Sequence, residues 1–164
     1  MTIDEVNRLD HARFVAAVGW AFEHSPWVAE RAFASRPFAG LEALHAAMVE
    51  QVTLATTPEK LALLRAHPDL GTRARMSGAS DKEQSGAGLD SLTPDEFEQF
   101  GRLNSGYRGR FGFPFLFAVK GSTKHDILRA LQARMEASPE QEFAEALRQV
   151  YRIAGFRLEG LITS

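Results

Sequence analysis

The chain of 164 residues contains no cysteine. This absence excludes disulfides, thiol nucleophiles and zinc sites built from thiolates. Glycine-rich phosphate-binding loops and the Gly-x-Ser-x-Gly element of serine hydrolases are also missing. The histidines include no pair at the spacing typical of metal ligands; they are His11, His24, His45, His67 and His125. We therefore expect no metal and no cofactor, which leaves chemistry by histidine, carboxylate and arginine, or a binding module without chemistry.

Surplus positive charge and long apolar runs are missing as well. The 19 lysines and arginines are outnumbered by 21 acidic residues, so no basic excess is available to neutralise nucleic-acid phosphates. No apolar run approaches the roughly 18 to 20 residues that span a bilayer, and no N-terminal targeting segment is evident. We expect a soluble, cytoplasmic protein that binds neither nucleic acid nor membrane. Arg73 and Arg75 are then either local anion contacts or solvated surface.

Apolar residues recur at helical spacing along most of the chain. A hydrophobic content of 45% is enough for one sizeable core, and no linker or repeat interrupts it, so we expect a single domain over residues 1–164. Helix-capping signals precede several of the periodic stretches, at Thr2, Thr57, Ser80, Thr93 and Ser138. The predicted fold class is all-α, with about seven or eight helices and one irregular apolar segment.

The stretch from Arg65 to Arg73 is the first candidate site. Pro68 cannot extend a helix and disfavours helical backbone at the residue before it, so His67 is expected in an exposed, stiff turn at a helix exit. An imidazole has an ordinary pKa of about 6.5 and can transfer protons near neutrality. Two interpretations stay open, because His67 is either a proton-transfer group or a residue that simply marks the end of the helix.

Two further segments also have both a structural and a functional interpretation. Ser80 and Glu83 have the spacing of a capping box that begins a short helix, and the free amides of a helix N-terminus also attract anions. The apolar run 110–121 contains Gly112 and Pro114. We interpret it as a strand or loop that crosses the core, or as a segment whose free amides bind a ligand.

Four motifs taken together resemble one enzyme family. In chain order they are His67-Pro68-Asp69-Leu70-Gly71; Ser80-x-x-Glu83-Gln84 with Ala87-Gly88-Leu89; Asn104-x-x-Tyr107-x-x-Arg110-Phe111-Gly112-Phe113-Pro114-Phe115 with Ala118-Val119-Lys120-Gly121; and Arg157-Leu158. Their order and spacing are similar to those of the 2-oxo-4-hydroxy-4-carboxy-5-ureidoimidazoline (OHCU) decarboxylase family of urate degradation. The resemblance implies an all-α homodimer that acts without a cofactor after uricase and hydroxyisourate hydrolase, and releases (S)-allantoin.

The same resemblance implies a set of site residues. The family's proton donor falls on His67, and Glu83 joins it as a catalytic residue that holds either the imidazole tautomer or the hydroxyl and ureido groups of the substrate. The positions that contact the anionic ureidoimidazoline substrate fall on Pro68, Ser80, Glu83, Gln84, Phe115, Leu116, Phe117, Ala118, Val119 and Arg157. Arg152, five residues before Arg157, is the other candidate for the anion contact.

The competing hypothesis is a catalytically inert all-α scaffold or interaction module. In that case the His67 turn, the Ser80 capping box and the apolar segment are structural only. Urate supplied together with uricase and hydroxyisourate hydrolase distinguishes the two hypotheses, because only a decarboxylase accelerates allantoin formation and makes it stereoselective.

Overall fold

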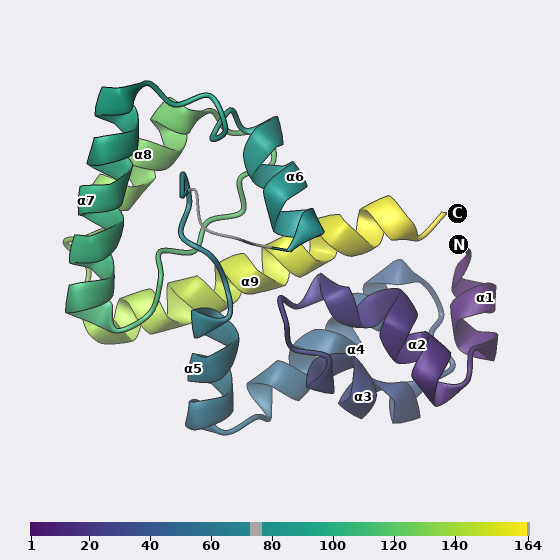
Figure 1. The fold of residues 1–164 in the computed structure, drawn as a ribbon. Helices are drawn as coiled ribbons and strands as arrows, with labels where there is room; N and C mark the ends of the chain where they lie inside the picture. Colours follow the sequence, from purple (N-terminus) through teal and green to yellow (C-terminus); the bar gives the residue numbers. More distant parts are fainter. Residues whose placement is uncertain (73–76, 164) are drawn as a thin grey trace. The chain divides into compact units, whose positions relative to one another are not determined.

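The structure, a computed structural model, describes residues 1–72 and 77–163. Arg73 and Arg75, considered above as anion contacts or solvated surface, lie outside the described residues. Within these two ranges the chain forms nine α-helices, two short 3-10 helices and no β-strand (Figure 1). The predicted all-α class is confirmed, with slightly more helices than the seven or eight expected.

The helices follow one another with short connections, except after α5 and after α7. Their bounds are α1 (Ile3–Arg8), α2 (His11–Val18), η1 (Gly19–Ala21), α3 (Trp27–Ala32), η2 (Phe33–Ser35), α4 (Leu41–Thr53), α5 (Thr57–Arg65), α6 (Gly78–Gly86), α7 (Pro94–Phe111), α8 (Lys124–Arg134) and α9 (Pro139–Leu161). Among the described residues, none of these helices has the length and apolar character needed to cross a membrane.

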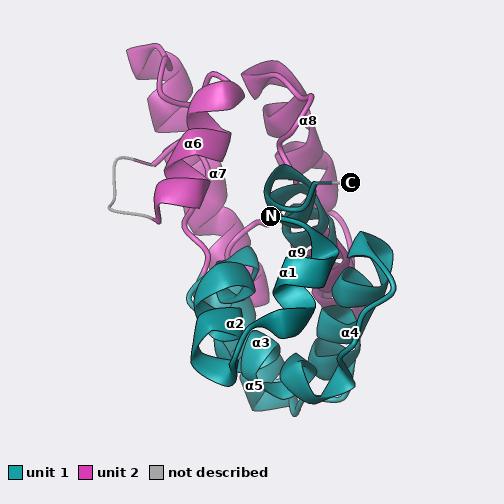
Figure 2. Cartoon of the chain, turned by 90° about the vertical axis from the view of Figure 1, so that its right-hand side faces the viewer, with its two compact units in different colours: residues 1–66, 151–164 teal, residues 67–150 magenta. Residues whose placement is uncertain are grey.

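The chain divides into two units (Figure 2). Unit 1 consists of Met1–Ala66 and Tyr151–Ser164, and unit 2 of the residues between them. Helix α9 begins in unit 2 and ends in unit 1. In unit 1, α3 packs against α2 and α4, and apolar side chains such as Phe14, Val28 and Met48 are fully buried. The single domain expected over the whole chain stays a prediction.

Side-chain caps start most of the helices, and three of the five expected caps are confirmed, at Thr2, Thr93 and Ser138. The cap of α5 is Thr56 rather than Thr57, because only Thr56 lies three residues before Glu59 and can exchange hydrogen bonds with it in a capping box. Helix α6 begins earlier than expected as well. Its cap is Ser77, whose hydroxyl accepts from the backbone N–H of Ser80 at 3.1 Å, so Ser80 lies inside the helix.

In unit 2, α7 and α8 pack together and run in the same direction. At their N-termini the Lys124 ammonium donates to Glu96 Oε1 at 2.7 Å. At the other end, Arg110 donates to the carbonyl of Ala137, just beyond α8, at 3.0 Å. Because α7 has 18 residues and is about 27 Å long, the chain must return nearly that distance before α8 can begin.

The return is made by the apolar segment between Gly112 and Thr123. Gly112 ends α7 in the left-handed conformation with φ 80°, which costs glycine little. Residues 113–119 then form neither helix nor strand and are mostly buried. The irregular apolar segment predicted from the sequence is therefore confirmed, and of the two structural interpretations the loop is correct.

The contact between Glu96 and Lys124 makes a testable contribution to stability. Hydrogen bonds from Lys124 and from the backbone of Thr93 lower the pKa of Glu96 from 4.5 to about 2. Because the pKa is lower in the folded state, the carboxylate stabilises the fold above pH 4.5, and this contribution is lost as the pH falls towards 2. We expect Glu96→Gln to lower the melting temperature at pH 7, and we expect this difference from wild type to shrink steadily as the pH falls from 4.5 to about 2. A difference in melting temperature that does not change with pH would contradict this assignment.

Candidate active site

His67 lies in the turn that follows α5. The helix ends at Arg65, and the N–H of Ala66 still donates to the carbonyl of Ala62 at 3.0 Å. Pro68 then stops the helix, as predicted. His67 is only 5% exposed, so the expectation of an exposed histidine is wrong. The reason is tertiary, because buried side chains of α6 and α7 hydrogen-bond to the backbone of the turn and hold it inside the unit.

Gln84 of α6 binds the turn at two points. Its Oε1 accepts from the backbone N–H of Gly71 at 2.9 Å, and its Nε2 donates to the carbonyl of Asp69 at 3.2 Å. The side chain is 6% exposed. One buried amide thus supplies the donor and the acceptor that an irregular turn cannot find in regular secondary structure. Gln84, predicted as a substrate contact, also holds the backbone that carries His67.

Helix α7 holds the same turn through two residues that lie one helical turn apart on one face. Asn104 donates from Nδ2 to the carbonyl of Leu70 at 2.8 Å, and Arg108, four residues later, donates from Nε to Asp69 Oδ1 at 2.8 Å. Asn104 is buried, and its Oδ1 has no hydrogen-bond partner within the described residues. The sequence motif contained Asn104 but did not indicate this role. Nothing in the sequence pointed to Arg108.

Ser80 and Glu83 do not form the capping box that their spacing suggested. Ser80 is buried in the first turn of α6, on the same face as Gln84, whereas Glu83 lies in the middle of the helix and is half-buried. A carboxylate at that position cannot reach back to the cap of α6, because the third helical position is already Ser80. The capping interpretation of Glu83 is therefore wrong.

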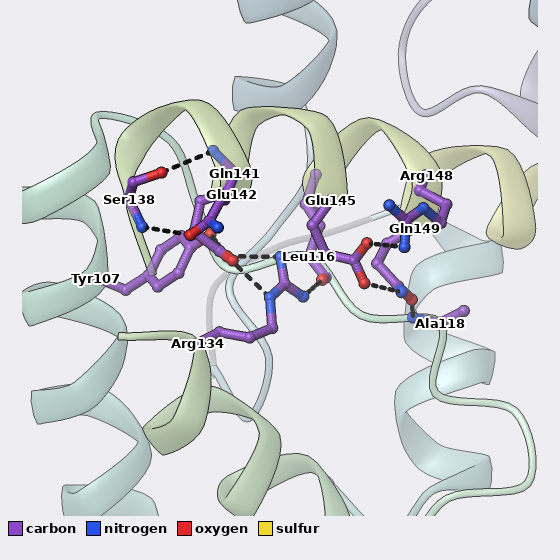
Figure 3. Close-up of polar contacts among 10 residues, drawn as sticks. All are labelled: Tyr107, Leu116, Ala118, Arg134, Ser138, Gln141, Glu142, Glu145, Arg148 and Gln149. Atoms are coloured by element: carbon purple, nitrogen blue, oxygen red, sulfur yellow. Dashed lines mark hydrogen bonds and ion pairs between the residues drawn. The ribbon is translucent and has the colours of Figure 1, made fainter. Parts of the chain in front are cut away.

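The segment from Phe115 to Val119 is held by side chains of α8 and α9 (Figure 3). The carbonyl of Leu116 accepts a hydrogen bond from Nη1 of Arg134, and the N–H of Ala118 donates to Oε1 of Gln149 at 2.9 Å. All five predicted contact residues lie on this segment, and all are buried except Phe117, which is half-buried.

Arg134 is itself fixed by a buried polar cluster (Figure 3). Its guanidinium pairs with Glu142 at 2.8 Å and lies over the ring of Phe115, 4.6 Å from the centroid. The hydroxyl of Tyr107 donates to the same carboxylate oxygen of Glu142. Burial, together with this hydrogen bond, raises the pKa of Tyr107, so the phenol stays protonated and remains a donor.

Gln149 has a second contact that orients its amide. Its Nε2 donates to Oε1 of Glu145 at 3.3 Å, and the other oxygen of Glu145 pairs with Arg148 at 2.7 Å. With the nitrogen directed to a carboxylate, the oxygen of the amide faces Ala118. Glu142 and Gln149 are buried polar residues on the apolar face of an amphipathic helix. A polar residue at a position where helical periodicity expects an apolar one was the only feature of the sequence that could have identified them.

Arg157 and the alternative anion contact Arg152 belong to unit 1, whereas the other predicted site residues belong to unit 2. The guanidinium of Arg157 donates to Glu23 Oε2 at 3.1 Å and to the carbonyl of Trp20 at 3.1 Å. Both charged side chains are almost completely buried, at 3% and 2% exposed. Glu23, which sequence reasoning missed, holds the guanidinium of Arg157 in one orientation. Arg152, the alternative anion contact, is exposed.

Metal ligation finds no support in the described part of the chain. Within it, no group of three or more histidine, aspartate or glutamate side chains is placed to hold an ion. Unit 2 thus contains a buried imidazole on a braced turn, a half-buried carboxylate on α6 and a braced, irregular backbone segment. These groups can move a proton and bind polar groups of a ligand.

The amino-acid sequence is similar to known decarboxylases. A family model described as OHCU decarboxylase matches residues 7–159. The 2-oxo-4-hydroxy-4-carboxy-5-ureidoimidazoline decarboxylase of Haloferax volcanii is 50% identical over 158 residues, which are 96% of this chain and 94% of that protein. The uric acid degradation bifunctional protein PucL of Bacillus subtilis is 48% identical over 99% of this chain, but this chain spans only 33% of that protein.

Solved structures show the same fold. A crystal structure of (S)-allantoin synthase matches with a TM-score of 0.78 and 38% identity over 99% of this chain, which spans about half (54%) of that longer chain. A crystal structure of an OHCU decarboxylase in the presence of (S)-allantoin matches with a TM-score of 0.70 and 25% identity, covering 84% of this chain and 92% of that one.

Gly71 offers a test of how tightly the His67 turn is packed. Its φ of 71° is left-handed, and an added Cβ would lie 3.0 Å from Leu92 Cδ1 and 3.1 Å from Phe100 Cγ. Gly88 has a similar φ of 81° with no atom within 4 Å of such a Cβ, so it is a matched control for the backbone cost alone.

We expect Gly88→Ala to cost about 1 to 2 kcal/mol of unfolding free energy, which is the cost of left-handed backbone. Gly71→Ala should cost about 2 to 4 kcal/mol, because the clash of the new Cβ with Leu92 and Phe100 adds to the backbone cost. Urea unfolding of both variants measures the difference. Equal losses would mean that the turn has room to relax.

Proposed function

The chain belongs to the OHCU decarboxylase family, and we propose that it converts OHCU into (S)-allantoin without a cofactor, with His67 as the proton donor. Decarboxylation of OHCU to allantoin is the family's step in urate degradation. The observation that carries the assignment is the identity of half of the residues to a decarboxylase of nearly the same length. The turn motif His67 to Gly71 lies within the matched region.

The chemistry of the substrate explains why side chains suffice. In OHCU the carbon that carries the carboxylate also carries a hydroxyl group and adjoins a C=N bond of the ring. When the bond to the carboxylate breaks, CO₂ leaves and the electron pair is delocalised into this conjugated system, so the ring itself serves as the electron sink. One proton must then be added to the carbon that carries the ureido group. The face from which it comes determines the enantiomer of allantoin.

The enzyme then has three tasks, namely to bind an anion, to hold the ring with the breaking bond perpendicular to its plane, and to deliver the proton to one face. His67 suits the last task, because the hydrogen bonds of Gln84 and Asn104 to its turn limit how far the imidazole can move. Glu83 is the second catalytic residue of the proposal. It either holds the imidazole of His67 in one tautomer or accepts hydrogen bonds from the substrate. Its half-buried position, away from the helix cap, supports a functional role.

The remaining contacts belong to the same proposal. Pro68, Ser80, Gln84 and the segment from Phe115 to Val119 line the substrate, and Arg157 or Arg152 binds its carboxylate. For Arg157, support comes from its fixed guanidinium, which Glu23 orients. We further propose a homodimer in the cytoplasm, as for a metabolic enzyme of this family. Sedimentation analysis tests the oligomeric state.

The test of the function is a coupled assay. Urate, uricase and hydroxyisourate hydrolase generate OHCU, and the decay of its absorbance and the circular dichroism of the product are followed with and without this protein. We expect faster decay and one enantiomer of allantoin. Racemic allantoin formed at the spontaneous rate would instead support the inert scaffold or interaction module.

In the same assay, His67→Asn should lower turnover by roughly 100-fold to 10,000-fold, the usual contribution of a positioned general acid. Because His67 is buried, the variant's fold is checked by circular dichroism and its melting temperature is compared with wild type. A folded variant with wild-type turnover would remove His67 from the mechanism.

Glu83→Gln keeps the shape of the side chain but removes its charge. If the carboxylate orients His67 or binds the substrate, we expect turnover to fall by roughly 30-fold to nearly 1000-fold, equivalent to about 2 to 4 kcal/mol in the barrier. Glu96→Gln makes the same change in a capping box and should leave turnover unchanged. Equal, small effects at the two positions would show that Glu83 has no part in catalysis.

A further inference from the structure

Phe117 lies between the two residues whose backbone groups are held by side chains. The carbonyl of Leu116 points to Arg134, and the N–H of Ala118 points to Gln149. Arg134 is paired with Glu142, so both contacts come from the side of the segment that faces residues 142–149 of α9 (Figure 3). These two contacts fix the orientation of the peptide groups before and after Phe117.

Peptide geometry then determines where the polar groups of Phe117 point. In a planar trans peptide the N–H is directed opposite to the carbonyl of the preceding residue. Neither peptide is among the cis bonds of the described chain. The N–H of Phe117 must therefore point away from Arg134, and its carbonyl must point away from Gln149. Both groups face the side of the segment opposite to residues 142–149.

On that side the backbone of Phe117 has no partner among the described residues. Within residues 1–72 and 77–163, neither its N–H nor its carbonyl makes a hydrogen bond. The residue is half-buried, and its ring stacks on Phe115 with centroids 6.0 Å apart. A donor and an acceptor left together in a mostly buried segment are costly unless something else satisfies them.

We infer that Arg134 and Gln149 are positioning residues, which turn the N–H and carbonyl of Phe117 towards the substrate as a paired donor and acceptor. This inference rests on the proposed function. The two groups of one residue, directed to one side, form the pair that joins neighbouring antiparallel strands. A cyclic ureide, in which a ring N–H adjoins a ring carbonyl, presents the complementary acceptor and donor. The 2-oxoimidazoline ring of OHCU and the hydantoin ring of allantoin belong to this chemical class.

The polar cluster behind Arg134 is consistent with a positioning role. A buried ion pair adds little net stability, and apolar residues of similar volume often stabilise a core better. Glu142 and Tyr107 nevertheless occupy buried positions, and the half-buried Arg134 joins them to the segment that carries Phe117. What the cluster supplies is a fixed direction for the carbonyl of Leu116, and through it for the N–H of Phe117.

The direct test observes the Phe117 amide. Protein labelled with ¹⁵N-phenylalanine gives one cross-peak for each phenylalanine, and the Phe117 peak is identified as the one lost in Phe117→Leu. On titration with (S)-allantoin we expect this peak to shift downfield and saturate, while the peak of Phe33 in η2 stays in place. A wild-type enzyme that decarboxylates OHCU but shows no saturable shift at Phe117 would overturn the inference and leave the proposed function intact.

The second test removes one contact at a time. Gln149→Met keeps the volume and loses the acceptor for Ala118, with Gln132→Met on the exposed face of α8 as its control. Arg134→Met is combined with Glu142→Gln, so that no buried carboxylate is left unpaired, and Arg129→Met on α8 is the control. We expect KM for OHCU to rise about tenfold in both test variants, as for one net hydrogen bond lost. The enantiomeric purity of the allantoin should fall, and both controls should match wild type.

These readouts separate positioning from structural support. Side chains that only stabilise the fold would lower the melting temperature and leave KM and enantiomeric purity unchanged, which would overturn the inference. If (S)-allantoin shifts the Phe117 peak equally in wild type and in Gln149→Met, Gln149 is not a positioning residue. Absence of decarboxylation by the wild-type protein is a different result, because it contradicts the proposed function itself.

Discussion

The parallel arrangement of α7 and α8 is the constraint on which the organisation of unit 2 depends. Two packed helices that run in the same direction need a connection as long as the first helix, and here no strand is available to pair with it in the described chain. The connection is apolar and buried, yet every residue in it except Pro114 carries a backbone donor and an acceptor. Side chains must therefore supply the hydrogen bonds that a neighbouring β-strand would otherwise provide. Arg134 of α8 and Gln149 of α9 do so.

The His67 turn has the same problem and the same solution. Pro68 prevents a continued helix, and the residues after it are held by the amides of Gln84 and Asn104 instead of by regular secondary structure. In both segments an irregular backbone is fixed by buried side chains from rigid helices. Such a backbone is held in one orientation and can still direct some of its polar groups towards a ligand. This combination suits a reaction whose catalytic demands are orientation and one proton.

Unit 1 shows a related arrangement at its buried charge pair. Arg157 is oriented by Glu23 and by the carbonyl of Trp20. A buried arginine without a carboxylate would be very costly, so Glu23 compensates the charge and restricts the guanidinium to one orientation. Next to this pair, His24 has a φ of 45°, the one left-handed residue other than glycine among the described residues. Strained backbone of this kind persists only where the surrounding packing enforces it.

The amino-acid sequence by itself determined the helical class, most of the helix starts, the break at Pro68 and the irregular segment after α7. These features depend on local chemistry, namely helical periodicity, capping hydroxyls and the geometry of proline and glycine. The motifs also identified the family. Only the tertiary structure decided that His67 is buried, that Gln84 holds its turn, and that Arg134 and Gln149 hold the irregular segment after α7. Each of these contacts joins residues far apart in the chain, such as Ala118 and Gln149, and helical spacing does not encode which buried faces meet.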